Sequence, residues 1–497
     1  MRRHRWSRAV RVAAAALAIG PFALPSGEAF AQEAPTWWQF QAGPGHPGVL
    51  ADGPEPPYRV RWTLPAPAGD ALSGAVVAGD LAVSVGTEAV YGIDVVSGAI
   101  EWQVARGGGP LSMPAIGAGP RGRILVYLEG PGPSDGRGAS EVSPSPSERA
   151  TPSAPPSTTT GSGPSPTGPQ EEPDISTLVG VSLADRTELW RTPLEAISRS
   201  GVTIEGTNAF VGDQGGTVYA VSLESGSITW SAEMEGLVDS PVAVARNTDP
   251  AQVVVAAFDE ATGERSWPAL AIQANSTAGS APSAGGGSVF IGSADRRVRA
   301  LDANGGSERW ATLVLSLFSP VTSLAFDDES VFAADIAGGL YRLDAADGKR
   351  RWSYQLNEVV LRSSPVVSGS SLLLGLSDGR LVALDTASGH LVWQSAPSPG
   401  LVGTIALTSD AVLAVKGGRE AGLIAFEHDP DGELVDIPSP TELDAGTTVT
   451  RWTLAALIVF AIAFVPGMWA NRRWGTAGWK QGNDDDLDRD PEREEAP

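Results

Sequence analysis

The sequence predicts an all-β protein, an eight-bladed β-propeller with seven blades as the alternative, followed by one C-terminal transmembrane helix. Three observations carry this prediction. An eleven-residue pattern recurs along the 497-residue chain, most copies lie about 40 residues apart, and an uncharged apolar stretch stands near the C-terminus. About 40 residues make one four-stranded propeller blade. The repeats therefore indicate one ring of blades rather than several separate domains.

The recurring pattern predicts a strand, a tight turn and a second strand, as in residues 383–393 (ALDTASGHLVW). Glycine supplies the positive φ of the turn, and the Asp hydrogen-bonds the turn backbone. The final Trp has a large apolar surface and an N–H that needs a partner. We expect each Trp to lie over the turn of the next repeat. The structural docking residues are Asp94, Gly98, Trp102, Trp190, Gly226, Trp230, Asp259, Gly263, Trp267, Asp302, Gly306, Trp310, Asp344, Gly348, Trp352, Asp385, Gly389 and Trp393; Trp190 ends a degenerate copy in which Arg186 replaces the glycine.

The spacing of the Trp residues sets the number of blades. From Trp62 to Trp393 they lie 37 to 43 residues apart, except for a gap of 88 between Trp102 and Trp190. This series defines seven blades. An eighth segment, residues 401–426, has no Trp of its own, and we expect residues 58–64 to supply its outer strand. Pairing of the first and last segments closes the ring and removes open sheet edges. Seven blades would result if the last segment is not a blade.

Residues 130–173 explain the long gap. They are mostly Pro, Ser, Thr, Gly and acidic residues, a composition that cannot bury enough apolar surface to fold. Without these 44 residues the gap shrinks to 44, a normal blade. We therefore expect a disordered loop insertion within blade 2. It is interpreted as a solvated loop open to glycosylation, or as an arm that reaches the cell wall or a partner.

Both ends of the chain carry membrane-targeting signals. Residues 1–31 have an Arg-rich start, an apolar core and a small-x-small site at residues 29–31, which predicts a signal peptide; an uncleaved anchor is the alternative. Residues 452–470 are long enough, at about 28 Å, to span a bilayer as a helix. Arg472 and Arg473 follow this span, so the positive-inside rule places the C-terminus in the cytoplasm. Between them we expect the extracytoplasmic propeller at 32–438 and a stalk at 439–451, with an acidic cytoplasmic tail at 471–497.

The pattern A-x-D-x-x-x-G-x-x-x-W resembles the tryptophan-docking repeat of the pyrroloquinoline-quinone (PQQ) β-propeller family. The resemblance extends from about Trp37 to Leu434, and residues 37–48 resemble the segment before the first blade. The family includes quinoprotein alcohol dehydrogenases and the non-enzymatic BamB-type outer-membrane assembly lipoproteins. The resemblance implies eight blades and a structural role for the docking residues.

Composition narrows the chemistry. A net charge of −23 argues against nucleic-acid binding. With no Cys the chain has no disulfide, thiolate metal site or lipidated Cys, and its four His residues lack zinc-ligand spacing. The quinoproteins that it resembles need a channel calcium held by Glu and Asn, an Asp base and, in many members, adjacent Cys residues. No such ligand motif surrounds the Asn residues, so we expect no catalytic, cofactor-binding or metal residues and no cofactor.

These observations together favour a binding protein. We expect a single-pass cell-membrane protein whose propeller acts as a protein-binding or scaffolding module of the bacterial cell envelope. Its partners would be envelope proteins or peptides, the membrane through the C-terminal helix, and no nucleic acid. The alternatives are a PQQ- and calcium-dependent dehydrogenase, and an envelope sensor that passes a binding event to the cytoplasmic tail.

Overall fold

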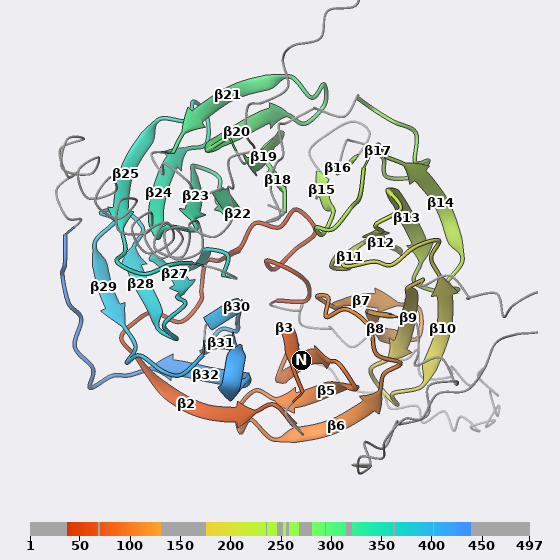
Figure 1. Cartoon of the computed structure of the whole chain (residues 1–497), viewed down its shortest axis with the longest axis horizontal. Coiled ribbons are helices and arrows are strands. Elements are labelled where there is room, and N and C mark those ends of the chain that lie inside the picture. The colour runs from red at the N-terminus through yellow and green to blue at the C-terminus, as the bar shows by residue number, and fades with distance from the viewer. Residues whose placement is uncertain are drawn as a thin grey trace, which may run out of the picture.

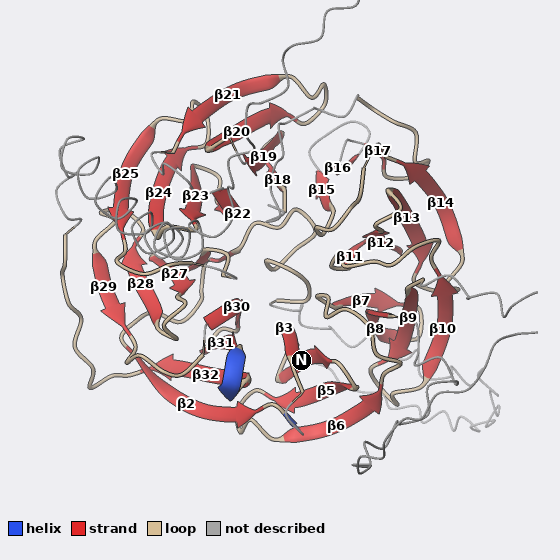
Figure 2. Cartoon of the chain, viewed as in Figure 1, coloured by secondary structure: helices blue, strands red, loops and turns tan. Residues whose placement is uncertain are grey.

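The computed structural model describes residues 37–438, apart from 68–69, 131–174, 235, 246–251, 255–257, 268–280, 294, 315–320, 361–362 and 401. Across these described residues the strands pair into eight sheets, arranged around a central axis (Figures 1 and 2). The predicted all-β propeller is confirmed. Residues 402–428, the segment that decides between seven and eight blades, form strands of a separate sheet.

Each blade is an antiparallel meander that runs from the axis outward. Blade 1 contains β3 (Leu72–Ala78), β4 (Leu81–Gly86), β5 (Ala89–Asp94) and β6 (Ile100–Ala105); blade 2 contains β7 (Ala115–Gly119), β8 (Gly122–Glu129), β9 (Thr177–Ser182) and β10 (Glu188–Pro193); blade 3 contains β11 (Thr203–Glu205), β12 (Asn208–Gly212), β13 (Thr217–Ser222) and β14 (Ile228–Glu233); blade 4 contains β15 (Ala243–Ala245), β16 (Gln252–Val254) and β17 (Phe258–Asp259).

The second half of the ring repeats this arrangement. Blade 5 contains β18 (Ser283–Gly285), β19 (Ser288–Ser293), β20 (Arg297–Asp302) and β21 (Glu308–Leu313); blade 6 contains β22 (Val321–Phe326), β23 (Ser330–Asp335), β24 (Gly339–Asp344) and β25 (Arg350–Gln355); blade 7 contains β26 (Val366–Ser368), β27 (Ser371–Gly375), β28 (Leu381–Asp385) and β29 (Leu391–Gln394), with β1 (Val49–Leu50) parallel to β26. Blade 8 contains β30 (Val402–Leu407), β31 (Ala411–Lys416), a 3₁₀ turn (Gly418–Glu420), β32 (Gly422–His428) and β2 (Tyr58–Pro65).

The position of a strand within its blade explains its sequence. The middle strands lie between two neighbouring blades and are buried on both faces, so they are short continuous apolar runs such as β27 (SLLLG). The outer strands alternate exposed and partly buried residues, as β6 does. The last hairpin of a blade contains a register shift beside its Trp, for example between Ala383 and Leu384. Such a bulge redirects the side chain, and here it accompanies the Trp that contacts the next blade.

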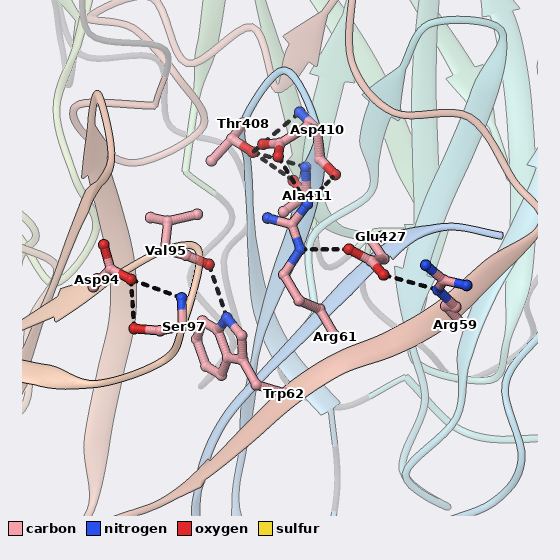
Figure 3. A network of polar contacts seen from close by, with 10 residues as sticks. All are labelled: Arg59, Arg61, Trp62, Asp94, Val95, Ser97, Thr408, Asp410, Ala411 and Glu427. Carbon is pink, nitrogen blue, oxygen red and sulfur yellow. Dashed lines mark hydrogen bonds and ion pairs between the residues drawn. The ribbon is translucent and has the colours of Figure 1, made fainter.

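The ring closes by pairing an N-terminal strand with the last strand, as expected. β2 pairs antiparallel with β32 as the outer strand of blade 8. Arg61 bridges two carboxylates, Glu427 at 2.8 Å and Asp410 at 2.7 Å (Figure 3). On the inner side, the Tyr58 ring meets the Trp393 ring edge to face, with centroids 5.1 Å apart. This joint therefore combines a backbone ladder, an ion-pair network and aromatic packing.

Several expected segments lie outside the described residues: the signal peptide at 1–31, most of the insertion at 130–173, the stalk at 439–451, the span at 452–470 and the tail at 471–497. The insertion's flanks are β8 and β9, so it belongs to the middle hairpin of blade 2. Among the described residues, no helix has the length and apolar character needed to cross a membrane.

We predict that Tyr58→Ala loosens ring closure. The change removes an aromatic ring that packs on Trp393, and its cost should be about 3 kcal/mol in the free energy of unfolding. Tyr58→Phe keeps the ring and loses only the hydroxyl bond to the Pro54 carbonyl, at about 1 kcal/mol. Urea denaturation of both variants measures the difference. Equal losses would show that the hydroxyl, and not the ring contact, matters at the joint.

Candidate functional site

Residues 37–50 cross the centre of the ring and bind the innermost strands of seven blades (Figure 1). In six of these blades a strand N–H donates to a backbone carbonyl of the segment at 2.7–2.8 Å. In blade 3 the Ile204 N–H donates to Oε1 of Gln39 at 2.6 Å, and Nε2 of Gln39 donates to the Ile204 carbonyl. The six backbone pairs are Val77–Trp37, Ile116–Trp38, Val244–Pro44, Ala284–Gly45, Phe326–Pro47 and Val367–Gly48.

The local sequence suits this crowded path. Gln41, Ala42 and His46 have positive φ values of 47°, 72° and 53°, which bend the chain from one blade to the next. Gly45 touches the backbone of blade 5, where a Cβ would lie 2.3 Å from the Ala284 carbonyl oxygen. Most of these contacts lie near the end of an innermost strand beside its first turn, whereas Ile116 lies near the start of β7. The segment therefore covers the axis on the side of the ring that carries the first and third turns of each blade.

His46 is held entirely within this centre. Its Nδ1 lies 3.0 Å from the Pro282 carbonyl and its Nε2 lies 3.2 Å from the Thr203 hydroxyl. The side chain is fully buried, and the Phe40 ring meets it edge to face at 5.2 Å. Burial lowers the pKa of His46 to about 4. A neutral imidazole that donates to a carbonyl and accepts from a hydroxyl joins blades 3 and 5, so its role is structural.

The predicted docking residues meet between neighbouring blades. Six indoles lie over the turn glycine of the next blade, where a glycine Cβ would come within 2.5–2.7 Å of the indole. These glycines have φ values of 69–73°, as the turn requires. Each indole N–H also donates to a backbone carbonyl of the same turn. The pairs of indole and carbonyl are Trp62–Val95, Trp190–Leu223, Trp230–Glu260, Trp267–Ala303, Trp310–Ala345 and Trp352–Thr386.

The motif carboxylates hold the turns themselves. Asp94 accepts from the Ser97 N–H at 2.7 Å, and Asp385 accepts from the Ser388 N–H at 2.7 Å. The hydrogen bond from the Ser97 hydroxyl is the largest cause of the lowered Asp94 pKa. Asp302 and Asp344 have lowered pKa values chiefly because Arg309 and Arg351 bind them. Asp259 accepts from the Thr262 N–H in the same way.

Two Trp residues depart from the pattern. The buried Nε1 of Trp102 has no hydrogen-bond partner within the described structure. The turn that faces it carries Arg186 in place of glycine, with φ at 64°, and the guanidinium lies 5.7 Å from the indole centroid. Trp393 packs edge to face against Tyr58 and Phe426 at the closing joint. The degenerate copy in the sequence thus marks a joint of different geometry between blades 1 and 2.

Other buried polar groups also brace turns. The Tyr219 hydroxyl donates to Asp213 at 2.7 Å, and the Tyr341 hydroxyl donates to Asp335 at 2.9 Å. Each carboxylate also accepts a backbone N–H of its hairpin. Burial raises the pKa of Tyr219 to about 12. In the part of the chain that the structure describes, no group of three or more His, Asp or Glu residues could hold a metal ion.

Two elements of this surface were missed by sequence reasoning. The central segment was expected only to precede blade 1, although its glycines and Gln39 were in view. Residues 435–437 pair with β29 on the outer edge of blade 7, where Leu391 and Ile437 exchange hydrogen bonds of 3.0 and 3.1 Å. The ring thus has an axis covered by residues 37–50 and two faces formed by turns. The outer edge of blade 7 is partly covered by residues 435–437.

The contacts between each Trp and the turn glycine of the next blade, which we call docks, and the eight sheets define a tryptophan-docked β-propeller. A family described as "Outer membrane protein assembly factor BamB" matches residues 175–270 and 251–417. Over residues 175–417 the chain is therefore similar to this PQQ-like propeller repeat family.

The chain is also similar to individual relatives at low identity. The chain is 26% identical over 251 residues to BamB of Moranella endobia, covering 47% of this chain and 63% of that relative. It is 23% identical to BamB of Yersinia pestis over 51% of this chain and 67% of that protein. The crystal structure of the computationally designed Ika8 protein superposes with a TM-score of 0.51 at 13% identity, covering 74% of this chain and 99% of that one. The last similarity concerns the fold alone.

We predict that the docking glycines resist substitution more strongly than other glycines with positive φ. Gly389→Ala adds left-handed strain and drives a Cβ into Trp352, so it should cost about 3 kcal/mol in the free energy of unfolding. Gly206→Ala is the matched control, because φ is 56° there and nothing lies within 4 Å of the new Cβ. It should cost about 1 kcal/mol. Denaturation curves that show equal costs would contradict the docking contact.

We predict that His46 makes the propeller sensitive to acid. The unfolded chain binds a proton near pH 6.5, whereas the folded chain does so only near pH 4. Stability from this group is therefore complete above pH 6.5 and is lost as the pH falls toward 4, by about 3 kcal/mol. In His46→Gln that loss should vanish. Parallel stability curves for the two proteins between pH 7 and pH 4 would refute this.

Proposed function

We propose that the chain is a membrane-anchored, extracytoplasmic β-propeller that acts as a protein-binding or scaffolding module of the bacterial cell envelope and performs no catalysis. The observation that carries this proposal is the centre of the ring, where the chain's own residues 37–50 bind seven blades. The surfaces that remain for other molecules are the turns and the outer strands. Relatives named as outer membrane protein assembly factors support a role in assembly of envelope proteins.

The alternative of a PQQ-dependent dehydrogenase would need its ligands near the axis. In the described residues the polar side chains at that place contact blade backbone: Gln39 contacts Ile204, Nε2 of Gln41 donates to the Leu324 carbonyl at 2.8 Å, and His46 contacts Pro282. The buried Oε1 of Gln41 has no hydrogen-bond partner among these residues. These groups hold the segment in position. They support a structural centre over a catalytic one.

The position of the proposed membrane anchor determines which surfaces of the propeller are accessible. Residues 435–437 run along the outer edge of blade 7 before the stalk and the proposed helix at 452–470. A ring tethered at one edge would leave both turn faces accessible in the extracytoplasmic space. The sensor alternative needs the acidic tail, so function that survives deletion of residues 484–497 would rule it out.

Site-specific photo-crosslinking of the full chain in living cells tests the proposal. A photoreactive residue replaces Ser225 on one turn face or Gln214 on the other, with buried Leu374 as the matched control. We expect crosslinks to defined envelope proteins from the turns and not from Leu374. The proposal would be wrong if the turns gave no protein crosslinks and calorimetry showed saturable, Ca²⁺-dependent binding of PQQ.

A further inference from the structure

Residues 434–437, here called the edge segment, lie along the outside of β29 as an extra strand of blade 7 (Figure 1). Val435 and Ile437 hydrogen-bond to β29 through their backbone groups. Alternate residues of a strand direct these groups to opposite edges. Leu434 and Asp436 therefore direct theirs away from the blade, and they form no backbone hydrogen bond within the described part of the chain. Blade 7 thus ends in an open strand edge.

The edge segment is apolar although it is exposed. Leu434, Val435 and Ile437 are 56%, 42% and 43% exposed, and they are three of the ten large hydrophobic residues that are exposed in the described structure. Side chains alternate along a strand, so Val435 and Ile437 share one face and Leu434 shares the other face with Asp436. An open strand edge is a template for pairing with another chain. The charges beside it then decide which chain can pair.

These charges are mainly negative. Residues 429–437 contain four carboxylates and no Lys or Arg. Arg59 binds Glu427 and is also attracted by Asp429 and Asp431, whereas Glu433 is exposed and forms no ion pair among the described residues. The other cations around the segment are bound to carboxylates as well, in the pairs Arg61–Glu427, Arg61–Asp410, Arg380–Asp378 and His390–Asp436. A basic strand therefore complements this edge.

We propose that the edge segment pairs with an extended segment of an envelope partner in which apolar residues alternate with Lys or Arg. The apolar face of that segment lies beside Val435 and Ile437. Its basic face lies beside Asp436, where the alkyl stem of a Lys or Arg packs on Leu434. Backbone hydrogen bonds to the edge supply affinity, and the side chains on its two faces supply specificity.

The charges argue against a second copy of this chain as the occupant. Pairing of two edge segments would bring Glu433 and Asp436 of both copies together, and like charges on neighbouring strands are destabilising. The inference rests on the proposed function, to which it adds a place and a partner chemistry.

Peptide binding to the full chain in detergent tests the backbone pairing. Fluorescein-labelled KVKVKVK is compared by fluorescence anisotropy with two modified forms, one N-methylated at every Val and the other at every Lys. Each form lacks the N–H donors of one strand edge. We expect one form to bind like the unmodified peptide and the other to bind at least fivefold more weakly, because it loses backbone hydrogen bonds to the edge segment.

Charge changes test the partner chemistry. The peptide EVEVEVE should not bind, because its carboxylates face those of the propeller. Glu433→Lys should weaken binding of KVKVKVK about fivefold. Glu224→Lys is the matched control, since it makes the same charge change at an exposed position of blade 3, and it should leave binding unchanged.

Several results would overturn the inference. Equal binding of KVKVKVK and EVEVEVE, or equal effects of Glu433→Lys and Glu224→Lys, would exclude recognition by charge. Equal binding of both N-methylated forms would exclude strand pairing. A full chain that is dimeric in light scattering and does not bind KVKVKVK would assign the edge to a second copy. Failure of the peptide together with crosslinks from the turns would reject this edge and leave the scaffolding role standing.

Discussion

The contact between an indole and the turn glycine of the next blade is the interaction on which the ring depends. A four-stranded blade buries its middle strands only against neighbouring blades, so the joints carry the stability of the whole. A Trp side chain supplies a large apolar surface, and its N–H satisfies a carbonyl that the turn leaves free. The glycine is required twice, for its positive φ and for the space that a Cβ would take from the indole.

The central segment satisfies hydrogen-bond donors of the innermost strands. The innermost strands present backbone N–H groups toward the axis, and buried donors without partners are costly. Residues 37–50 supply carbonyls to six blades, and the Gln39 amide serves the seventh. One irregular segment thus accepts hydrogen bonds from the inner edges of several separate sheets. The docks join neighbouring blades, whereas this segment connects blades across the ring.

Local patterns made the fold and the docks predictable from sequence. The pairing of β2 with β32 followed from counting strands, since blade 8 lacked a Trp hairpin. The path of residues 37–50 did not follow, because its partners lie up to hundreds of residues away and its turns match no repeat. For the same reason, nothing in residues 435–437 predicted their pairing with Leu391. Arg186 in the place of a glycine was visible, but only the structure shows that Trp102 loses its hydrogen bond there.

A propeller with a filled axis must interact through its periphery, and this changes which sequence features carry functional meaning. Residues that match the repeat maintain the joints, so they say little about partners. Departures from the repeat say more, because the ring tolerates them only where neighbouring contacts compensate. At the joint of blades 1 and 2, the Arg186 guanidinium lies over the Trp102 ring in place of the usual contact between Trp and turn glycine. The weakest copy of the motif therefore marks the joint whose geometry differs most from the repeat.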